Sequence, residues 1–220
     1  MSSATLKLYS YWRSSSAYRV RLALELKRIH YENIPVNLIR DGGEQHHEVY
    51  RGLNPLGLVP CLADDDFVLT QSLAIFHYLE AQFPEPPLVP ADAREAARMW
   101  ALASVIACDT QPLQNLSVFA YLETELGQDQ AGRDAWARHW IGRGLDAFES
   151  LLADRPQNRF CNGTAPSFAD CTLLPQLYNA RRFGLDSSKW PRIVAVAEAL
   201  DDFPVVRAAH PDRQPDSPSN

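Results

Sequence analysis

The sequence has no excess of basic residues and no long apolar run. Its 220 residues include 21 Lys and Arg against 27 Asp and Glu, a formal net charge of −6. This balance gives no electrostatic support for binding nucleic acid, and an anionic ligand would need arginines placed close to it. No apolar run approaches the length of a membrane span. We therefore expect neither a nucleic-acid partner nor a membrane partner.

Cysteine is also scarce, and the four cysteines form no Cys-x-x-Cys pair. Cys61, Cys108, Cys161 and Cys171 stand mostly in apolar surroundings. This favours buried free thiols over a disulfide framework or a metal site, so no bound metal is expected. The opening segment MSSATLKLYS has neither the basic start nor the apolar core of a secretory signal peptide. The cytoplasm is therefore the expected compartment.

The first part of the chain alternates between strand-like and helix-like patterns. Strands are expected in TLKLYSY, in YENIPVNL and on both sides of the acidic turn in ADDD. Helices are expected over residues 16–28 and 72–83, with a polar loop and a short helix between the second and third strands. The resulting order βαβαββα predicts a small α/β domain over residues 1–84.

A proline-rich segment, FPEPPLVPAD, follows this domain and indicates a linker, because proline disfavours helix in the residue before it. Beyond the linker, apolar residues recur at helical spacing, and Ser167 and Asp170 form a capping-box pattern. An all-helical domain is expected over residues 92–220, with the polar, proline-rich end of the chain extended over the surface.

Three consecutive serines, Ser14 to Ser16, stand where the first strand gives way to the first helix. A helix N-terminus offers unpaired N–H groups and a partial positive charge, and a hydroxyl beside it adds another donor. These conditions stabilise a thiolate. The alternative is that the serines only cap the helix.

Two further segments of the first domain can bind a small peptide. A cis bond between Val59 and Pro60 would turn the N–H and C=O of Val59 outward to pair with an extended ligand, whereas the alternative is an ordinary edge-strand proline. Gln71 and Ser72 precede a helix, where they can bind a carboxylate or where Ser72 can cap the helix. Together with the serines, these segments describe a domain that binds glutathione by its thiol, cysteinyl backbone and γ-glutamyl end.

The sequence resembles the zeta class of the glutathione transferases over nearly its whole length. The resemblance is carried by YSYWRSSSAYRVRLAL, NLIRDGGEQ, LNPLGLVPCL, TQSLAIFHYLE, TQPLQNLSV, LPQLYNARRF and HPDRQPDSP. It implies a thioredoxin-like N-terminal domain, an all-helical C-terminal domain and a homodimer. It also implies reduced glutathione as the cofactor, bound by Ser14, Ser15, Gln45, Val59, Pro60, Gln71, Ser72, Gln111, Asn115, Leu116 and Ser117.

The serine segment departs from the zeta-class pattern at two positions. Zeta-class sequences typically carry a cysteine at the position of Ser16 and a tryptophan at the position of Tyr18. Since the reacting thiolate belongs to glutathione, loss of that cysteine does not remove the implied chemistry.

The activity implied by the resemblance is the cis–trans isomerisation of maleylacetoacetate to fumarylacetoacetate, a step of tyrosine degradation. Ser14, Ser15 and Arg13 are the expected catalytic residues, with Ser14 the first choice for holding the thiolate. The substrate is a small keto acid with two carboxylates, which Arg13 and Arg182 are expected to bind. A surface or interdomain salt bridge is the alternative for each arginine. The open alternatives for function are maleylpyruvate isomerisation, transfer of glutathione to α-halo acids, and a non-catalytic binding module of the same fold.

Overall fold

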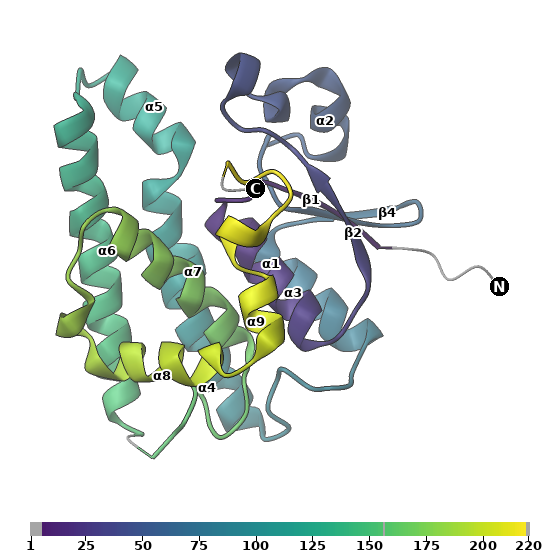
Figure 1. Cartoon of the computed structure of the whole chain (residues 1–220), viewed down its shortest axis with the longest axis vertical. Helices are drawn as coiled ribbons and strands as arrows, with labels where there is room; N and C mark the ends of the chain where they lie inside the picture. The colour runs from purple at the N-terminus through teal and green to yellow at the C-terminus, as the bar shows by residue number, and fades with distance from the viewer. Residues whose placement is uncertain (1–5, 156, 219–220) are drawn as a thin grey trace. The chain divides into compact units, whose positions relative to one another are not determined.

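The computed structural model describes residues 6–155 and 157–218, which form two compact units (Figure 1). The N-terminal unit comprises the chain up to Leu88 together with the segment from Phe203 onward, and the helical unit is Val89–Asp202. The sequence placed the end of the chain in the helical domain. In the structure that segment packs within the N-terminal unit, because α9 (Pro204–Ala208) lies against α1 (Ser15–Leu26) and buries Val206.

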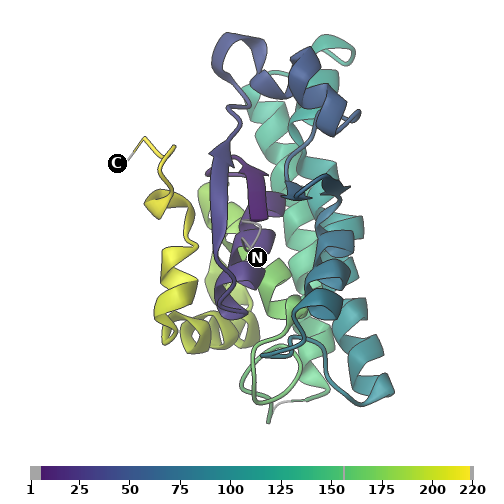
Figure 2. The same ribbon diagram turned by 90° about the vertical axis from the view of Figure 1, so that its right-hand side faces the viewer.

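The N-terminal unit is built on a four-stranded sheet with the order β2-β1-β3-β4. The strands are β1 Leu6–Ser10, β2 Tyr31–Pro35, β3 Cys61–Asp64 and β4 Phe67–Thr70. β1 runs parallel to its neighbour β2, as Figure 2 shows, and antiparallel to β3, which is antiparallel to β4. β2 is an edge strand and ends at Pro35, as expected for a residue that cannot donate to the ladder.

Beside α1, the α-helices of this unit within the described residues are α2 (Glu48–Leu53), α3 (Ser72–Gln82) and α9. Helix α1 is buried on almost every side, so its apolar residues do not form a single stripe. Two of its buried side chains, Arg19 and Arg21, are charged. A buried guanidinium has to be hydrogen-bonded, and the partners of both arginines lie next to the segments described below.

The helical unit contains five α-helices within the described residues, namely α4 Ala93–Ser104, α5 Leu116–Thr124, α6 Gln130–Ala153, α7 Phe168–Arg182 and α8 Pro191–Asp201. A π-helical stretch, Val105–Thr110, and a 3₁₀ turn, Gln111–Gln114, join α4 to α5. Helix α4 packs against α7, and α6 packs against α8. The expected α/β domain followed by helices is confirmed. None of the helices in the described part of the chain combines the length and apolar character that crossing a membrane requires.

The predicted capping box at the start of α7 is confirmed. The buried carboxylate of Asp170 accepts hydrogen bonds from the N–H of Ser167 at 2.8 Å and from the N–H of Cys161 at 2.9 Å. Burial raises the pKa of Asp170 above its usual value, despite these donors. The box therefore ties the loop before α7 to the first turn of that helix.

All four cysteines are free thiols, as expected. Cys61, Cys161 and Cys171 are buried, but Cys108 is exposed, so the expectation of burial is wrong at that position. Cys108 lies in the π-helical stretch Val105–Thr110. The buried face of α4 and of this stretch runs through Met99, Leu102, Ala103 and Ile106, and Cys108 lies off that face.

Candidate functional site

The register of the sheet brings to one end the three segments of the N-terminal unit that the sequence predicted to bind a peptide. Tyr9 of β1 pairs with Cys61 of β3, and Cys61 pairs with Thr70 of β4. The serine segment follows β1, the Val-Pro pair precedes β3, and the Gln-Ser pair follows β4. These three segments are far apart in the sequence and lie at the same end of the sheet, where β1 and β4 finish and β3 begins.

Ser14 caps helix α1. Its Oγ accepts a hydrogen bond from the N–H of Ala17 at 3.2 Å, and its own N–H donates to the carbonyl of Tyr11 at 2.9 Å. An oxygen that accepts from the helix still has a hydroxyl hydrogen to donate. Capping and thiolate binding, which the sequence presented as alternatives, are therefore compatible at Ser14. Ser15 is the first residue of α1 and is 7% exposed.

The two candidate arginines each lie over an aromatic ring. The guanidinium of Arg13 is half-buried and lies 5.3 Å from the centre of the Trp12 ring. The guanidinium of Arg182 is exposed at the end of α7 and lies 4.5 Å from the centre of the Phe183 ring. A cation–π contact helps to orient a guanidinium, and the N–H edge of that group is the part that matches a carboxylate.

The bond between Val59 and Pro60 is cis, as the sequence analysis suggested. The carbonyl of Leu58 just before it accepts hydrogen bonds from the Tyr50 hydroxyl and from Nδ2 of Asn54, both at 2.7 Å. Among the described residues, neither the N–H nor the C=O of Val59 has a hydrogen-bond partner. A buried residue with two free peptide groups fits an extended ligand that supplies one donor and one acceptor.

Gln71 occupies the N-cap position of α3 with a φ of 70°, and its exposed side chain makes no hydrogen bond to the first turn. Ser72 is buried and does not cap the helix, so the capping interpretation of Ser72 is wrong. Its Oγ instead accepts a hydrogen bond from Nη1 of Arg19 at 3.1 Å. Because Arg19 uses only the acceptor side of that oxygen, the hydroxyl hydrogen of Ser72 remains available to donate to a ligand.

Gln45 lies in a short 3₁₀ turn, Glu44–His46, and is 7% exposed. Its Nε2 donates to the carbonyl of Leu38 at 3.2 Å, whereas its Oε1 has no hydrogen-bond partner among the described residues. An unsatisfied buried oxygen costs free energy, which a ligand donor would recover. Together with the free peptide groups of Val59, this side chain fits a peptide-like cofactor such as glutathione.

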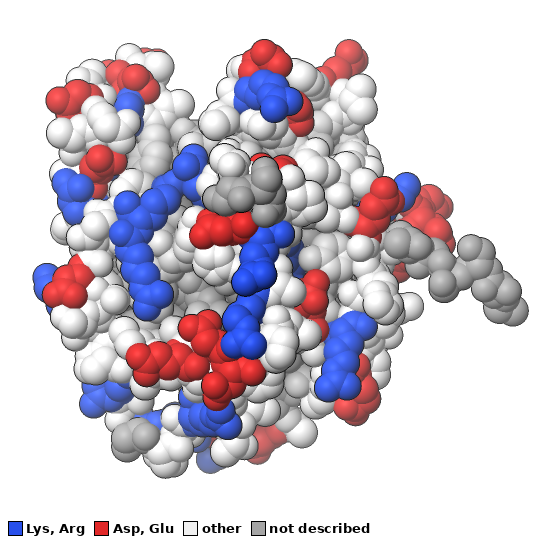
Figure 3. Space-filling view, in the orientation of Figure 1, with Lys and Arg blue, Asp and Glu red and all other residues white. Residues whose placement is uncertain are grey.

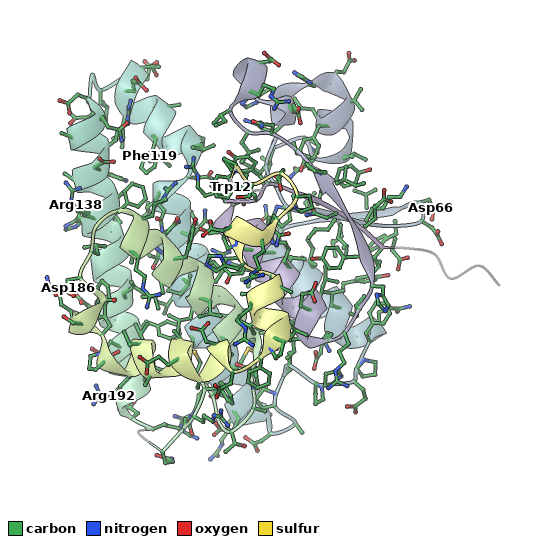
Figure 4. The ribbon with its side chains drawn as sticks, viewed as in Figure 1. Trp12, Asp66, Phe119, Arg138, Asp186 and Arg192 are labelled. Atoms are coloured by element: carbon green, nitrogen blue, oxygen red, sulfur yellow. The ribbon has the colours of Figure 1, made fainter. Side chains whose placement is uncertain are left out.

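The remaining candidate residues belong to the helical unit. Gln111 is half-buried at the start of the 3₁₀ turn, and Asn115 caps α5 by accepting from the N–H of Leu116 at 2.8 Å. Leu116 and Ser117 are exposed in the first turn of α5. Phe119 of α5, labelled in Figure 4, packs edge-on against Phe183, which places the start of α5 near the end of α7 and Arg182.

A buried amide network that the sequence analysis missed supports this part of the helical unit. Nε2 of Gln114 donates to Oε1 of Gln176 at 2.8 Å, and Nδ2 of Asn179 donates to Oε1 of Gln114 at 3.3 Å. The network joins the 3₁₀ turn to α7, one turn before Arg182. A sequence pattern for this network was present, because Gln176 and Asn179 are three residues apart in LPQLYNARRF and so lie on one face of a helix.

Basic side chains gather on the same unit. Figure 3 shows Lys and Arg side chains forming a band over the region where α6 and α7 lie in Figure 1. Arg181 and Arg182 at the end of α7 are both exposed. A local excess of positive charge is what the net charge of −6 requires for binding an anion.

Models of two protein families match the chain. The glutathione S-transferase N-terminal domain matches residues 4–81, and the glutathione S-transferase C-terminal domain matches residues 130–208. The chain therefore belongs to the glutathione S-transferase family, with a thioredoxin-like N-terminal domain and a helical C-terminal domain.

Within this family, the chain is similar to several proteins that are named isomerases. The chain is 46% identical to the maleylacetoacetate isomerase of Pseudomonas aeruginosa, over 97% of this chain and 100% of that protein. It resembles a crystal structure of maleylacetoacetate isomerase from Anaeromyxobacter dehalogenans with bound dicarboxyethyl glutathione and citrate, at 44% identity and a TM-score of 0.86, covering 99% and 96% of the two chains. It also resembles the holo structure of a bacterial zeta-class maleyl pyruvate isomerase, at 43% identity and a TM-score of 0.93, covering 96% and 99%.

Proposed function

We propose that the protein is a glutathione-dependent cis–trans isomerase that converts maleylacetoacetate to fumarylacetoacetate. The observation that carries this proposal is the meeting of the serine segment, Val59 and the Gln71–Ser72 pair at one end of the sheet, in a chain 46% identical to a maleylacetoacetate isomerase. A binding module without activity would not need all three segments, and full-length relatives that are named isomerases favour the enzyme.

When bound, glutathione supplies a thiol whose reversible addition to the double bond allows the substrate to pass from cis to trans. Ser14 would donate its hydroxyl hydrogen to the sulfur and favour the thiolate, with the N-terminus of α1 adding its partial positive charge. Ser15, more buried, is the second candidate for this role. Gln45, Val59, Pro60, Gln71 and Ser72 would hold the rest of the tripeptide, with Ser72 and the start of α3 facing its carboxylate.

The second part of the proposed site belongs to the helical unit. Gln111, Asn115, Leu116 and Ser117 would complete the binding of glutathione. Arg182 would bind a carboxylate of the substrate, and Arg13 would bind the other and stabilise negative charge that develops during the reaction. A relative that binds dicarboxyethyl glutathione supports a site for glutathione carrying two further carboxylates.

Maleylpyruvate is the second candidate substrate, and a specific observation favours testing it. The structural relative with a TM-score of 0.93 is a maleyl pyruvate isomerase. Both acids present a cis double bond conjugated to a carbonyl, so the same residues would serve either of them.

We also propose that the protein acts in the cytoplasm as a homodimer. The edge strand β4 supports the dimer, because Phe67 and Val68 leave apolar side chains 48% and 36% exposed on it. An exposed apolar edge strand presents unpaired N–H and C=O groups with which a strand of a second chain can pair.

The test is the rate of glutathione-dependent loss of maleylacetoacetate, with maleylpyruvate measured in parallel. Ser14→Ala is expected to lower kcat/KM by roughly 100-fold, the scale of losing one donor to a developing or stabilised anion. Arg182→Ala is expected to raise KM for the acid by about tenfold or more, because a charge-assisted hydrogen bond is lost. The matched controls are Ser16→Ala in the same serine run and Arg181→Ala beside Arg182, each with a rate close to wild type.

The outcomes separate the alternatives. Faster turnover of maleylpyruvate would keep the chemistry and change the substrate. Failure to isomerise either acid in the presence of glutathione would rule out the isomerase and leave transfer to α-halo acids or a binding module.

A further inference from the structure

The C-terminal segment, residues 203–218, reaches the loop that carries the serines. The backbone N–H of Trp12 donates to Oδ2 of Asp216 at 2.9 Å, across 204 positions of sequence. Figure 4 shows Trp12 beside the yellow turn near the end of the chain. Trp12 stands two residues before Ser14, so the carboxylate holds the backbone at the entry to the proposed thiolate site.

Arg21 of α1 binds the same loop through the carbonyl of Trp12. Its fully buried guanidinium donates to Oγ of Ser10 at 2.9 Å and to the carbonyl of Trp12 at 2.8 Å. It also donates to the carbonyl of Ala209 in the C-terminal segment at 3.2 Å. Burial lowers the pKa of Arg21 to about 10, so the side chain remains a cation at neutral pH. The N–H and C=O of Trp12 are thus held by opposite charges.

The segment that delivers Asp216 is itself ordered by the N-terminal unit. Nε2 of Gln214 donates to the carbonyls of Ala208 and His210, and Nδ2 of Asn33 in β2 donates to Oε1 of Gln214 at 3.3 Å. The ring of His210 packs edge-on against Tyr18 of α1. Asp216 therefore approaches Trp12 from a turn fixed to both the sheet and α1.

We propose that Asp216 is a positioning residue of the glutathione site, acting through the backbone of Trp12 on Ser14. The inference rests on the proposed function, because the loop matters for thiolate formation only if glutathione is the ligand. The hydrogen bond from the Trp12 N–H to an oxygen of Asp216 restricts the direction in which the chain leaves β1 toward the serines. A small displacement of a group that stabilises a reacting atom is enough to weaken its effect.

The experiment compares Asp216→Ala, Asp216→Asn and the control Asp66→Ala in the full chain. Asp66 is exposed in the turn between β3 and β4, and its replacement removes the same charge away from the serine loop (Figure 4). Three quantities are measured: hydrogen exchange of the Trp12 amide without ligand, the Kd for glutathione by calorimetry, and the pH titration of thiolate ultraviolet absorbance in the complex.

Asp216→Ala is expected to speed hydrogen exchange of the Trp12 amide and to raise the Kd for glutathione about tenfold. The pKa of the bound thiol is expected to move back toward its value in free glutathione. Asp216→Asn keeps an oxygen that accepts from Trp12 and is expected to stay close to wild type in all three measurements. Asp66→Ala is expected to match wild type.

Two results would overturn the inference while leaving the proposed function intact. One is an Asp216→Ala protein with a wild-type Kd and a wild-type thiol pKa, whatever its thermal stability. The other is an Asp216→Asn protein as impaired as Asp216→Ala. A wild-type protein that does not bind glutathione would overturn the proposed function and this inference with it, and that result is read from the wild type alone.

Discussion

Single side chains of this protein serve the fold and the proposed site together. Ser14 caps α1 through its oxygen and keeps its hydrogen for a ligand, and Ser72 at the start of α3 accepts a hydrogen bond from Arg19 through its oxygen. In both cases the hydroxyl oxygen accepts a hydrogen bond within the protein, and the hydroxyl hydrogen remains available to donate to a ligand. This arrangement suits anionic groups, which accept hydrogen bonds and cannot donate them.

At the same scale, burial is expected to make the buried thiols less reactive than the exposed thiol of Cys108. Burial raises the pKa of Cys61 to about 11 and raises that of Cys161 as well, so both remain protonated at neutral pH. A protonated, buried thiol reacts slowly, because the thiolate is the nucleophile. Alkylation of the native protein at neutral pH, followed by peptide mass spectrometry, is expected to label Cys108 first.

The same measurement has an internal control and a clear contrary result. In denaturant all four cysteines should react at similar rates, and in the native protein Cys61 should begin to react only as the pH approaches about 11. Rapid native labelling of Cys61 or Cys161 at neutral pH would contradict the burial described here.

At the scale of elements, helix α7 connects the folding of the helical unit to its proposed site. Its first turn contains the capping box, and its last two turns carry Gln176, Asn179 and Arg182. A displacement at the start of the helix would therefore also shift the amide network and Arg182, the arginine proposed to bind the substrate.

Asp170→Ala is expected to lower the free energy of unfolding by about 3 kcal/mol, because the N–H groups of Ser167 and Cys161 lose their acceptor. The matched control is Asp92→Ala, the exposed N-cap of α4, with an expected loss of about 1 kcal/mol. Both losses are measured by urea unfolding. Equal losses for the two variants would show that burial adds nothing to the cap of α7.

Element by element, local patterns anticipated much of the fold and less of the site. The four strands, α1, α3 and the capping box follow from alternation, helical spacing and cap chemistry, which act over a few residues. The exposure of Cys108 did not follow, because the buried face of this region runs through Met99, Leu102 and Ile106 and leaves Cys108 outside it. The role of Ser72 did not follow either, because its partner Arg19 lies 53 positions away.

At the scale of the whole molecule, the prediction concerns assembly. Phe67→Asp on β4 is expected to convert a dimer to a monomer, because a carboxylate cannot be buried without a partner. Light scattering should give twice the mass of one chain for wild type and the mass of one chain for the variant.

Leu151→Asp is the control, since Leu151 on α6 of the helical unit is 46% exposed, close to the value for Phe67. A wild-type protein with the mass of one chain would rule out the homodimer. Dissociation by Leu151→Asp instead of Phe67→Asp would place the interface on the helical unit.

The sequence by itself determined the order of elements, the family resemblance and the residue types of the proposed site, because helical period, strand alternation and motif spacing are local properties. Only the tertiary structure decided that the serines, Val59 and Ser72 share one end of the sheet, since that depends on strand register. It also decided that the end of the chain belongs to the N-terminal unit and that Asp216 holds Trp12. A contact across 204 positions leaves no local pattern, because it arises from the packing of α9 on α1.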